Sequence, residues 1–189
     1  MNAFDLSSID RTWTLFLDRD GVINQESPAY IFTPEEFIFY EGVEEALKIF
    51  NRIFGIIVIT TNQRGVGRGL MTEEALQSVH DKMLLDIAAA GGRIDQIYYC
   101  TAVDNDHPHR KPNPGMALQA MKDHPAIIRE KSLIVGNNLS DMEFGRNAGI
   151  FTVLLTTTGT RVKLPHPLVD LQFDTLIDFA RSLPAAPAT

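Results

Sequence analysis

Two carboxylates one residue apart follow a short apolar segment near the start of the chain. Residues 13–17 are mostly apolar, and Asp18 and Asp20 come directly after them. Such a segment is typical of a buried strand, and a parallel α/β sheet binds its ligands beyond the carboxyl ends of its strands. Acids at that edge can bind a divalent cation or exchange protons with a substrate. An acidic turn that merely closes the strand is the alternative, and the pair alone does not decide between the two.

Three later segments place polar or charged groups at similar positions. In chain order they are Thr61-Asn62-Gln63 after an apolar run, Arg110-Lys111 before a proline, and Gly136-Asn137-Asn138-Leu139-Ser140-Asp141 after Leu133-Ile134-Val135. Each motif is weak by itself. Four of them in this order, at plausible spacing, indicate one active site assembled from several strand ends.

This order of motifs resembles that of the haloacid dehalogenase-like phosphatase superfamily. More narrowly, Asp-Arg-Asp-Gly-Val-Ile-Asn, Thr-Asn-Gln-x-Gly-Val-x-Arg-Gly and Arg-Lys-Pro-x-Pro-Gly-Met are similar to the branch with D,D-heptose 1,7-bisphosphate and histidinol-phosphate phosphatases. The resemblance extends over residues 13–155. It implies a Mg²⁺-dependent phosphomonoesterase that acts on a small phosphorylated metabolite.

The resemblance also implies a role for each motif. Asp18 would attack phosphorus and form an aspartyl-phosphate, which divides one difficult step into two easier ones. Asp20 would protonate the leaving oxygen and then activate water. The phosphoryl oxygens would be bound by Thr61, Asn62 and Lys111, while Mg²⁺ neutralises their charge.

The predicted metal site departs from the family's pattern. We expect Mg²⁺ on Asp18, on Asp20 through its backbone carbonyl, and on the residue after Gly136, which is usually an acid and is Asn137 here. An amide oxygen brings no charge, so the affinity for Mg²⁺ should fall. Asp141 would coordinate through water or hold the loop. We favour an active enzyme because the other motif residues are present, and a catalytically weak metabolite-binding protein is the alternative.

A second departure lies in the segment that begins at Cys100. The heptose branch commonly holds a structural zinc there on a Cys, a His two residues later and two further Cys. This chain has Ala102 at the histidine position, and His107 and His109 at the cysteine positions. Tetrahedral structural zinc needs four ligands. We therefore predict less than one equivalent of zinc, with binding through Cys100, His107 and His109 as the alternative.

The charge balance bears on the substrate. A net charge of −7 with dispersed acids argues against a nucleic-acid surface, so a phosphorylated substrate needs a local group of cations. Arg64, Arg110 and Lys111 are candidates, whereas we expect Arg68 to be solvated. Arg110 suits a second anionic group because its planar fork can donate two hydrogen bonds. We therefore favour the 7-phosphate of D-glycero-D-manno-heptose 1,7-bisphosphate over histidinol phosphate, whose amine would need a carboxylate beside Arg110.

Alternating strand and helix patterns predict a three-layer α/β/α fold around a mainly parallel sheet, without a large cap domain. The expected strands are residues 13–17, 56–59, 94–100, 132–135 and 151–155, with a short edge strand at 169–173. The expected helices are residues 42–54, 72–90, 114–122, 140–148 and 175–183, with a flexible glycine loop at 65–69. Two histidines, His80 and His124, are predicted on helix surfaces.

Length and composition describe an ordinary globular chain. Its 189 residues, 44% of them hydrophobic, suit one domain over 1–189, with a lead-in at 1–11 and a frayed tail at 184–189. No apolar run approaches a membrane span and no signal sequence is recognisable. One cysteine fits a reducing compartment. We expect a cytoplasmic monomer that binds neither membranes nor nucleic acid.

Overall fold

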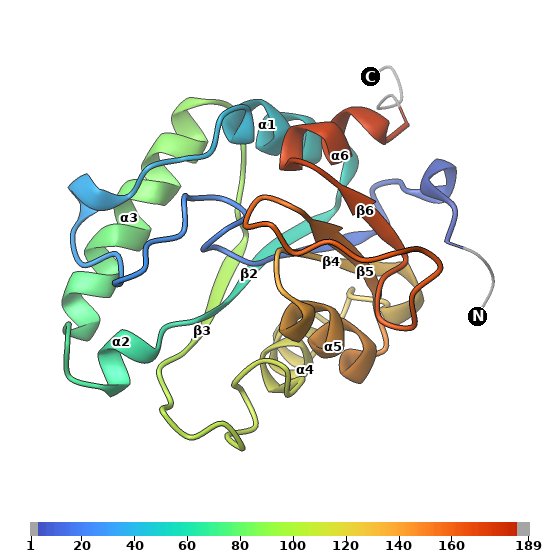
Figure 1. Ribbon diagram of the computed structural model, residues 1–189. Coiled ribbons are helices and arrows are strands. Elements are labelled where there is room, and N and C mark those ends of the chain that lie inside the picture. Colours follow the sequence, from blue (N-terminus) through green and yellow to red (C-terminus); the bar gives the residue numbers. More distant parts are fainter. Residues whose placement is uncertain (1–3, 185–189) are drawn as a thin grey trace.

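A computed structural model describes residues 4–184 and contains one six-stranded parallel sheet (Figure 1). The strands are ordered β3-β2-β1-β4-β5-β6. Their bounds are β1 Thr14–Leu17, β2 Ile56–Asn62, β3 Gln96–Cys100, β4 Ser132–Gly136, β5 Phe151–Leu155 and β6 Leu171–Phe173. All neighbouring pairs run parallel, so the carboxyl ends of the strands lie at one edge of the sheet. The predicted fold class is confirmed.

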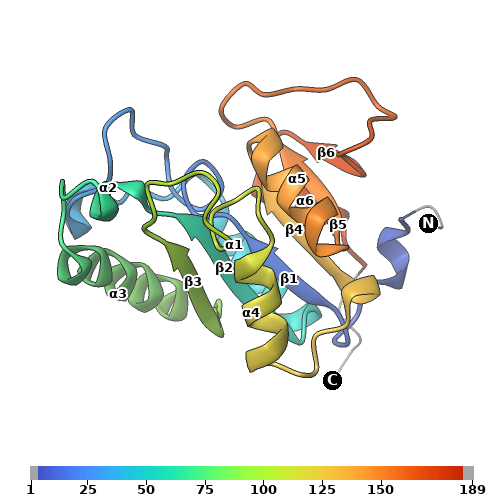
Figure 2. The same ribbon diagram turned by 90° about the horizontal axis from the view of Figure 1, so that it is seen from below.

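Helices cover both faces of the sheet (Figure 2). One face carries α1 Val43–Ile53, α3 Glu73–Ala89 and α6 Leu176–Ser182, and the other carries α4 Gly115–Asp123 and α5 Leu139–Ala148. The central strand shows why both faces must be covered. Leu15 and Leu17 point into the core under α1, α3 and α6, whereas Phe16 points into the core under α4 and α5. A parallel strand of this kind is apolar on both sides.

Side-chain caps determine where several helices begin. The hydroxyl of Thr72 accepts a hydrogen bond from the backbone N–H of Ala75, as predicted for the start of α3. Of the two residues predicted to cap α5, it is Asn138 that does so, and it forms a capping box with Asp141. A capping box pairs two backbone N–H groups that the first helical turn leaves unsatisfied. The cap thereby holds Asp141 at the carboxyl edge of β4.

The remaining elements are short. They are the 3-10 helices η1 Leu6–Ser8, η2 Pro34–Glu36 and η3 Arg129–Lys131, and the single helical turn α2 Arg64–Gly67. Between residues 23 and 42 the only helix is η2, so this segment holds no cap domain. None of the helices within residues 4–184 is long and apolar enough to cross a membrane. Most of the predicted tail, residues 185–189, lies outside the described residues.

Two sequence expectations were wrong. The segment at 65–69 is not a flexible loop, because α2 is closed by hydrogen bonds from Arg68 N to Arg64 O and from Gly69 N to Val66 O. His80 is not on a helix surface, because only 1% of it is exposed. It lies four residues after Leu76, on the buried face of α3. His124 follows the last residue of α4 and is half-buried.

Candidate active site

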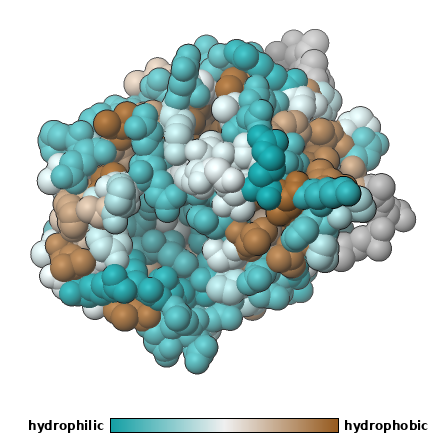
Figure 3. All heavy atoms as spheres, in the orientation of Figure 1, coloured by the Kyte–Doolittle hydropathy of each residue, from teal (hydrophilic) through white to brown (hydrophobic). Residues whose placement is uncertain are grey.

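The candidate catalytic residues gather at the carboxyl edge of the sheet. The strand order changes direction between β1 and β4, and open α/β sheets bind ligands beside such a switch point. A pocket of about 270 Å³ lies there, and its lining includes Asp18, Asp20, Thr61, Lys111 and Asp141. Hydrophilic side chains predominate on the face seen in Figure 3, where apolar residues form separate patches. The structure thus brings the separate sequence motifs to one site.

Asp18, Lys111 and Asp141 form a buried chain of ion pairs. Asp18 follows the last residue of β1, and its backbone N–H donates to Val135 O on β4 at 2.9 Å. The ammonium nitrogen of Lys111 lies 2.8 Å from Asp18 Oδ1 and 2.6 Å from Asp141 Oδ1. Asp18 Oδ1 also accepts from the backbone N–H of Arg19, at 2.8 Å. The other oxygen of Asp18, Oδ2, accepts no hydrogen bond within the described chain.

Each of these three side chains lies close enough to change how readily its neighbours ionise. Burial raises the pKa of Asp18, the charges of Asp141 and Asp20 add to the effect, and Lys111 opposes it. Burial alone would lower the pKa of Lys111, but the carboxylates of Asp141 and Asp18 outweigh it and raise the pKa. A second cation beside Asp18 would favour its charged form in the same way as Lys111 does. Asp18 and Asp141 share the single ammonium group of Lys111, so a cation beside Asp18 would be favourably placed.

Asn62 holds the loop that carries Lys111. Its Oδ1 accepts from the backbone N–H of Lys111 at 3.1 Å, and its Nδ2 donates to the backbone carbonyl of Lys111 at 3.2 Å. Both ends of the amide are thus used to hold the lysine in the pocket. A direct contact of Asn62 with phosphate stays a prediction.

Thr61 and Gln63 lie side by side at the end of β2. The amide of Gln63 donates to the hydroxyl oxygen of Thr61 at 2.8 Å and to Asp20 Oδ2 at 2.9 Å. The Thr61 hydroxyl accepts this hydrogen bond and donates none within the described residues, so its proton is available to another group. This arrangement allows Thr61 to donate to a phosphoryl oxygen and links it to Asp20.

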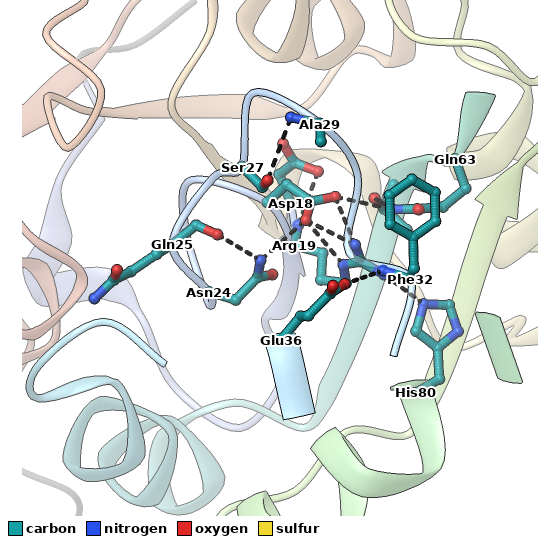
Figure 4. A network of polar contacts seen from close by, with 12 residues as sticks. Asp18, Arg19, Asn24, Gln25, Ser27, Ala29, Phe32, Glu36, Gln63 and His80 are labelled. Atoms are coloured by element: carbon teal, nitrogen blue, oxygen red, sulfur yellow. Dashed lines mark hydrogen bonds and ion pairs between the residues drawn. The ribbon is translucent and has the colours of Figure 1, made fainter. Parts of the chain in front are cut away.

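The carboxylate of Asp20 accepts hydrogen bonds from Arg19, Asn24 and Gln63, whose side chains Figure 4 draws in one network of polar contacts. Arg19 Nη2 lies 2.7 Å from Oδ1 and 2.9 Å from Oδ2, and Asn24 Nδ2 lies 3.0 Å from Oδ1. Burial would raise the pKa of Asp20, but Arg19, Asn24 and Gln63 outweigh it and lower the pKa. The carboxylate is thus held in one orientation and in its charged form.

Arg19 is itself buried and has a second partner. Only 1% of its side chain is exposed, and its Nη1 lies 3.2 Å from Nε2 of His80 on α3. The guanidinium carbon lies 5.9 Å from the ring centroid of Phe37. Sequence reasoning missed Arg19 and His80 as part of the site. A signal was available for His80, which shares a helical face with Leu76, Met83 and Ile87.

Asn137 lies beneath the turn that carries the two acids. Gly21 has φ +83° in that turn, and a Cβ there would lie 2.1 Å from Asn137 Nδ2, so no other residue fits. The amide nitrogen of Asn137 donates to Thr158 Oγ1 at 3.0 Å and to Glu26 Oε2 at 3.4 Å. Its Oδ1 is buried and has no hydrogen-bond partner among residues 4–184. A buried acceptor without a partner is costly unless a ligand satisfies it.

The donor set fits Mg²⁺ better than a cation that needs many protein ligands. No group of three or more His, Cys, Asp or Glu side chains in residues 4–184 is placed to hold a metal. Mg²⁺ is usually bound through one or two carboxylates, with water and phosphate oxygens completing its shell. Asp18 lines the pocket and can supply the carboxylate, whereas Asn137 does not line it and offers an unsatisfied oxygen beneath the turn, so its place in the metal shell stays a prediction. Asp141 instead uses its oxygens for Lys111 and for the backbone N–H of Asn138, so it holds the loop.

The three predicted zinc ligands are only partly brought together. Cys100 Sγ lies 3.6 Å from His107 Nδ1, and this nitrogen also accepts from the backbone N–H of His109 at 3.2 Å. The rings of His107 and His109 are 5.7 Å apart. Zinc binding at this loop is not shown, and low zinc content stays a prediction.

Three arginines lie beside the pocket without acidic partners. Arg110 Nη1 donates to the carbonyl of Ala102 at 3.2 Å, and Arg68 donates to the hydroxyl of Tyr30, which lines the pocket, at 3.0 Å. Arg68 is exposed, as expected, and its hydrogen bond to Tyr30 restrains the side chain. Burial and then the charge of Arg64 lower the pKa of Arg110. None of the three arginines forms an ion pair within the described residues.

Comparisons with known proteins agree with this geometry. A family model described as HAD-hydrolase-like matches residues 108–177. A D-glycero-D-manno-heptose-1,7-bisphosphate 7-phosphatase from Chlorobaculum tepidum is 37% identical over 155 residues, which cover 76% of this chain and 78% of that protein. A D-glycero-β-D-manno-heptose-1,7-bisphosphate 7-phosphatase from Pseudomonas putida is 36% identical over 172 residues, which cover 89% of this chain and 98% of that protein. Among solved structures, the fold is similar to that of D,D-heptose 1,7-bisphosphate phosphatase from B. bronchiseptica, which was crystallised with magnesium and phosphate. The TM-score is 0.82 at 30% sequence identity, and the match covers 89% of this chain and 96% of that one.

Proposed function

Because the chain belongs to the haloacid dehalogenase-like phosphatases, we propose that it is a Mg²⁺-dependent enzyme that removes the 7-phosphate of D-glycero-D-manno-heptose 1,7-bisphosphate. The main support for this proposal is that two separate groups of cationic side chains lie at one pocket. Lys111 contacts Asp18 inside the pocket, and the arginine group of Arg64, Arg68 and Arg110 lies beside it. A substrate with two phosphates can use both.

Asp18 is the proposed nucleophile. Its Oδ1 forms the ion pair with Lys111 and accepts a hydrogen bond from the backbone N–H of Arg19, so Oδ2 is the oxygen proposed to attack phosphorus. Lys111 and Thr61 then donate to the phosphoryl oxygens, and this positioning and charge neutralisation make up most of the catalysis of phosphoryl transfer. Mg²⁺, held by Asp18, the Asp20 backbone carbonyl and Asn137, would neutralise further charge on the phosphoryl group.

Asp20 is the proposed acid and base. The negative charge of a bound phosphate favours the uptake of a proton from solvent by Asp20, and Asp20 gives this proton to the oxygen of the departing alcohol as the bond to phosphorus breaks. It then takes a proton from the water that hydrolyses the aspartyl-phosphate, which restores Asp18 and releases phosphate. Its hydrogen bonds to Gln63 and Asn24 keep the carboxylate at the pocket wall, within the same network as Thr61.

The arginine group favours a bisphosphate over histidinol phosphate. Three guanidinium groups that have no acidic partner in the described part of the chain attract a second phosphate and repel the cationic amine of histidinol phosphate. Arg110 is the one that we propose to bind the second phosphate, because it is partly buried and held by Ala102 O. The names of the relatives support the same substrate.

The test is a side-by-side measurement of kcat/KM for the α and β anomers of the heptose bisphosphate and for histidinol phosphate, over a Mg²⁺ titration. We expect a heptose anomer to have the highest value and Arg110→Ala to raise its KM. A higher kcat/KM for histidinol phosphate, or an unchanged heptose KM in Arg110→Ala, would contradict the proposed substrate. Binding without turnover at every Mg²⁺ concentration would instead favour a metabolite-binding protein.

A further inference from the structure

We infer that His80 is a positioning residue for Asp20 and acts on it through Arg19. The inference deepens the proposed function and rests on it, because Asp20 is the acid and base only within that mechanism. His80 lies on α3, far along the chain from the catalytic motifs, yet its ring reaches the guanidinium group that binds Asp20 (Figure 4).

The three side chains form a continuous line of contacts, in which His80 and Arg19 are buried and Asp20 is half-buried. Arg19 donates to both oxygens of Asp20 through Nη2, at 2.7 and 2.9 Å, and Nε lies 3.3 Å from Oδ1. Its remaining nitrogen, Nη1, points to Nε2 of His80 at 3.2 Å. The guanidinium group is planar and rigid. A contact that fixes Nη1 therefore also fixes the positions of Nε and Nη2, the two nitrogens that face Asp20.

Nη1 of Arg19 needs an acceptor at this place. Arg19 is buried, and an unsatisfied donor on a buried cation is expensive. The imidazole of His80 can accept only if Nε2 carries no proton. Burial, and next the charge of Arg19, lower the pKa of His80 to about 4, so the ring is neutral near pH 7. His80 is therefore placed as an acceptor and not as a second cation.

The consequence for catalysis depends on the leaving group. An alkoxide is a poor leaving group and needs the proton from Asp20, whereas p-nitrophenolate leaves without one. Displacement of a catalytic group by about 1 Å can cost about 100-fold in rate. Loss of the His80 contact should thus slow the cleavage of an alkyl phosphate and largely spare that of p-nitrophenyl phosphate.

The experiment compares His80→Leu and His80→Gln with the wild-type enzyme. The substrates are the heptose bisphosphate, phenyl phosphate and p-nitrophenyl phosphate, and the quantity is kcat/KM, which reports the steps up to the first irreversible one. For His80→Leu we expect a loss of about tenfold or more with the heptose bisphosphate and of less than about threefold with p-nitrophenyl phosphate. His80→Gln, whose amide oxygen can accept from Arg19, should stay within about threefold of wild type on all substrates.

His124→Asn is the matched control, because His124 lies at the end of α4, and it should change no substrate's kcat/KM. Equal losses on all substrates in His80→Leu, no loss at all, or no rescue by glutamine would overturn the inference. Should His80→Leu not fold, Arg19→Lys keeps the charge but loses the fork, and the same selective loss is expected. A wild-type enzyme that cleaves only the aryl phosphates contradicts the proposed substrate, and the ratio between phenyl and p-nitrophenyl phosphate then decides the inference. If the wild type cleaves no phosphate ester, both proposals fail.

Discussion

The ammonium nitrogen of Lys111 lies 2.8 Å from Oδ1 of Asp18, and both residues are buried at the carboxyl edge of the sheet. This contact joins the first and third sequence motifs. It also separates two carboxylates, because the same nitrogen lies 2.6 Å from Asp141. The lysine is thus part of the fold's charge balance as well as of the proposed phosphate site.

Lys111→Met should lower both activity and stability. Without the ammonium group, Asp18 and Asp141 remain as neighbouring buried carboxylates, and breaking a buried ion pair costs about 3–5 kcal/mol. Urea unfolding measures the loss. The control is Lys82→Met, which removes an exposed ion pair with Asp86 on α3 and should cost less than about 1 kcal/mol. A similar, small loss in both variants would contradict the structural role of Lys111.

Asp18→Asn should abolish turnover while the fold remains. The substitution removes the attacking oxygen but keeps the shape of the side chain. The expected result is no measurable hydrolysis of p-nitrophenyl phosphate, with an unchanged far-ultraviolet circular dichroism spectrum. Activity above a few per cent of wild type would show that Asp18 is not the nucleophile.

Asn137→Asp should tighten Mg²⁺ binding and destabilise the metal-free protein. A carboxylate adds the charge that the amide lacks, so half-maximal activity should need less Mg²⁺. Glu26 Oε2 lies 3.4 Å from Asn137 Nδ2, so without Mg²⁺ the new carboxylate meets a like charge. Thermal unfolding with and without Mg²⁺ separates the two effects. An unchanged Mg²⁺ requirement would place Asn137 outside the metal shell.

His80 should make the free energy of unfolding depend on pH. Its pKa is lowered from 6.5 to about 4 on folding, so between these values the unfolded state binds more protons. Stability should therefore fall as the pH drops from about 6.5 to about 4, by about 3 kcal/mol from this residue. Arg19, Asp20 and Asp81 are the charged groups that act on the ring.

His80→Gln removes that part of the pH dependence and leaves the carboxylates in place. Unfolding by urea at about pH 7.5 and about pH 5 should show a smaller loss of stability in the variant than in the wild type. Equal losses would mean that His80 titrates near its unfolded value in the folded protein.

The purified protein should contain less than one equivalent of zinc. Cys100 and His107 are neighbours, but the structure brings no third ligand of this loop to them within the described residues. Elemental analysis measures the content directly. Stoichiometric zinc that is lost in Cys100→Ser would contradict the prediction and make His107 and His109 ligands.

Local patterns in the sequence determined most of the fold. The strand from Phe151 to Leu155 agrees with the predicted residues 151–155, and Thr72 caps α3 as expected. Both follow from interactions within a few residues, namely apolar periodicity and a side-chain cap. The motif order also predicted that Asp18, Asp20, Thr61 and Lys111 share one site, since the ends of parallel strands meet at one edge.

Which side chains contact one another was decided only by the tertiary structure. The Arg19–His80 contact depends on how α3 packs against the loop after β1. The residues around Arg19 and those around His80 do not by themselves indicate that packing. The same holds for Asn62, whose amide pairs with the backbone of Lys111, and for Asn137, which lies under Gly21. Periodicity shows which face of an element is buried, but a buried polar group is satisfied by whichever partner the packing of distant segments brings within hydrogen-bond distance.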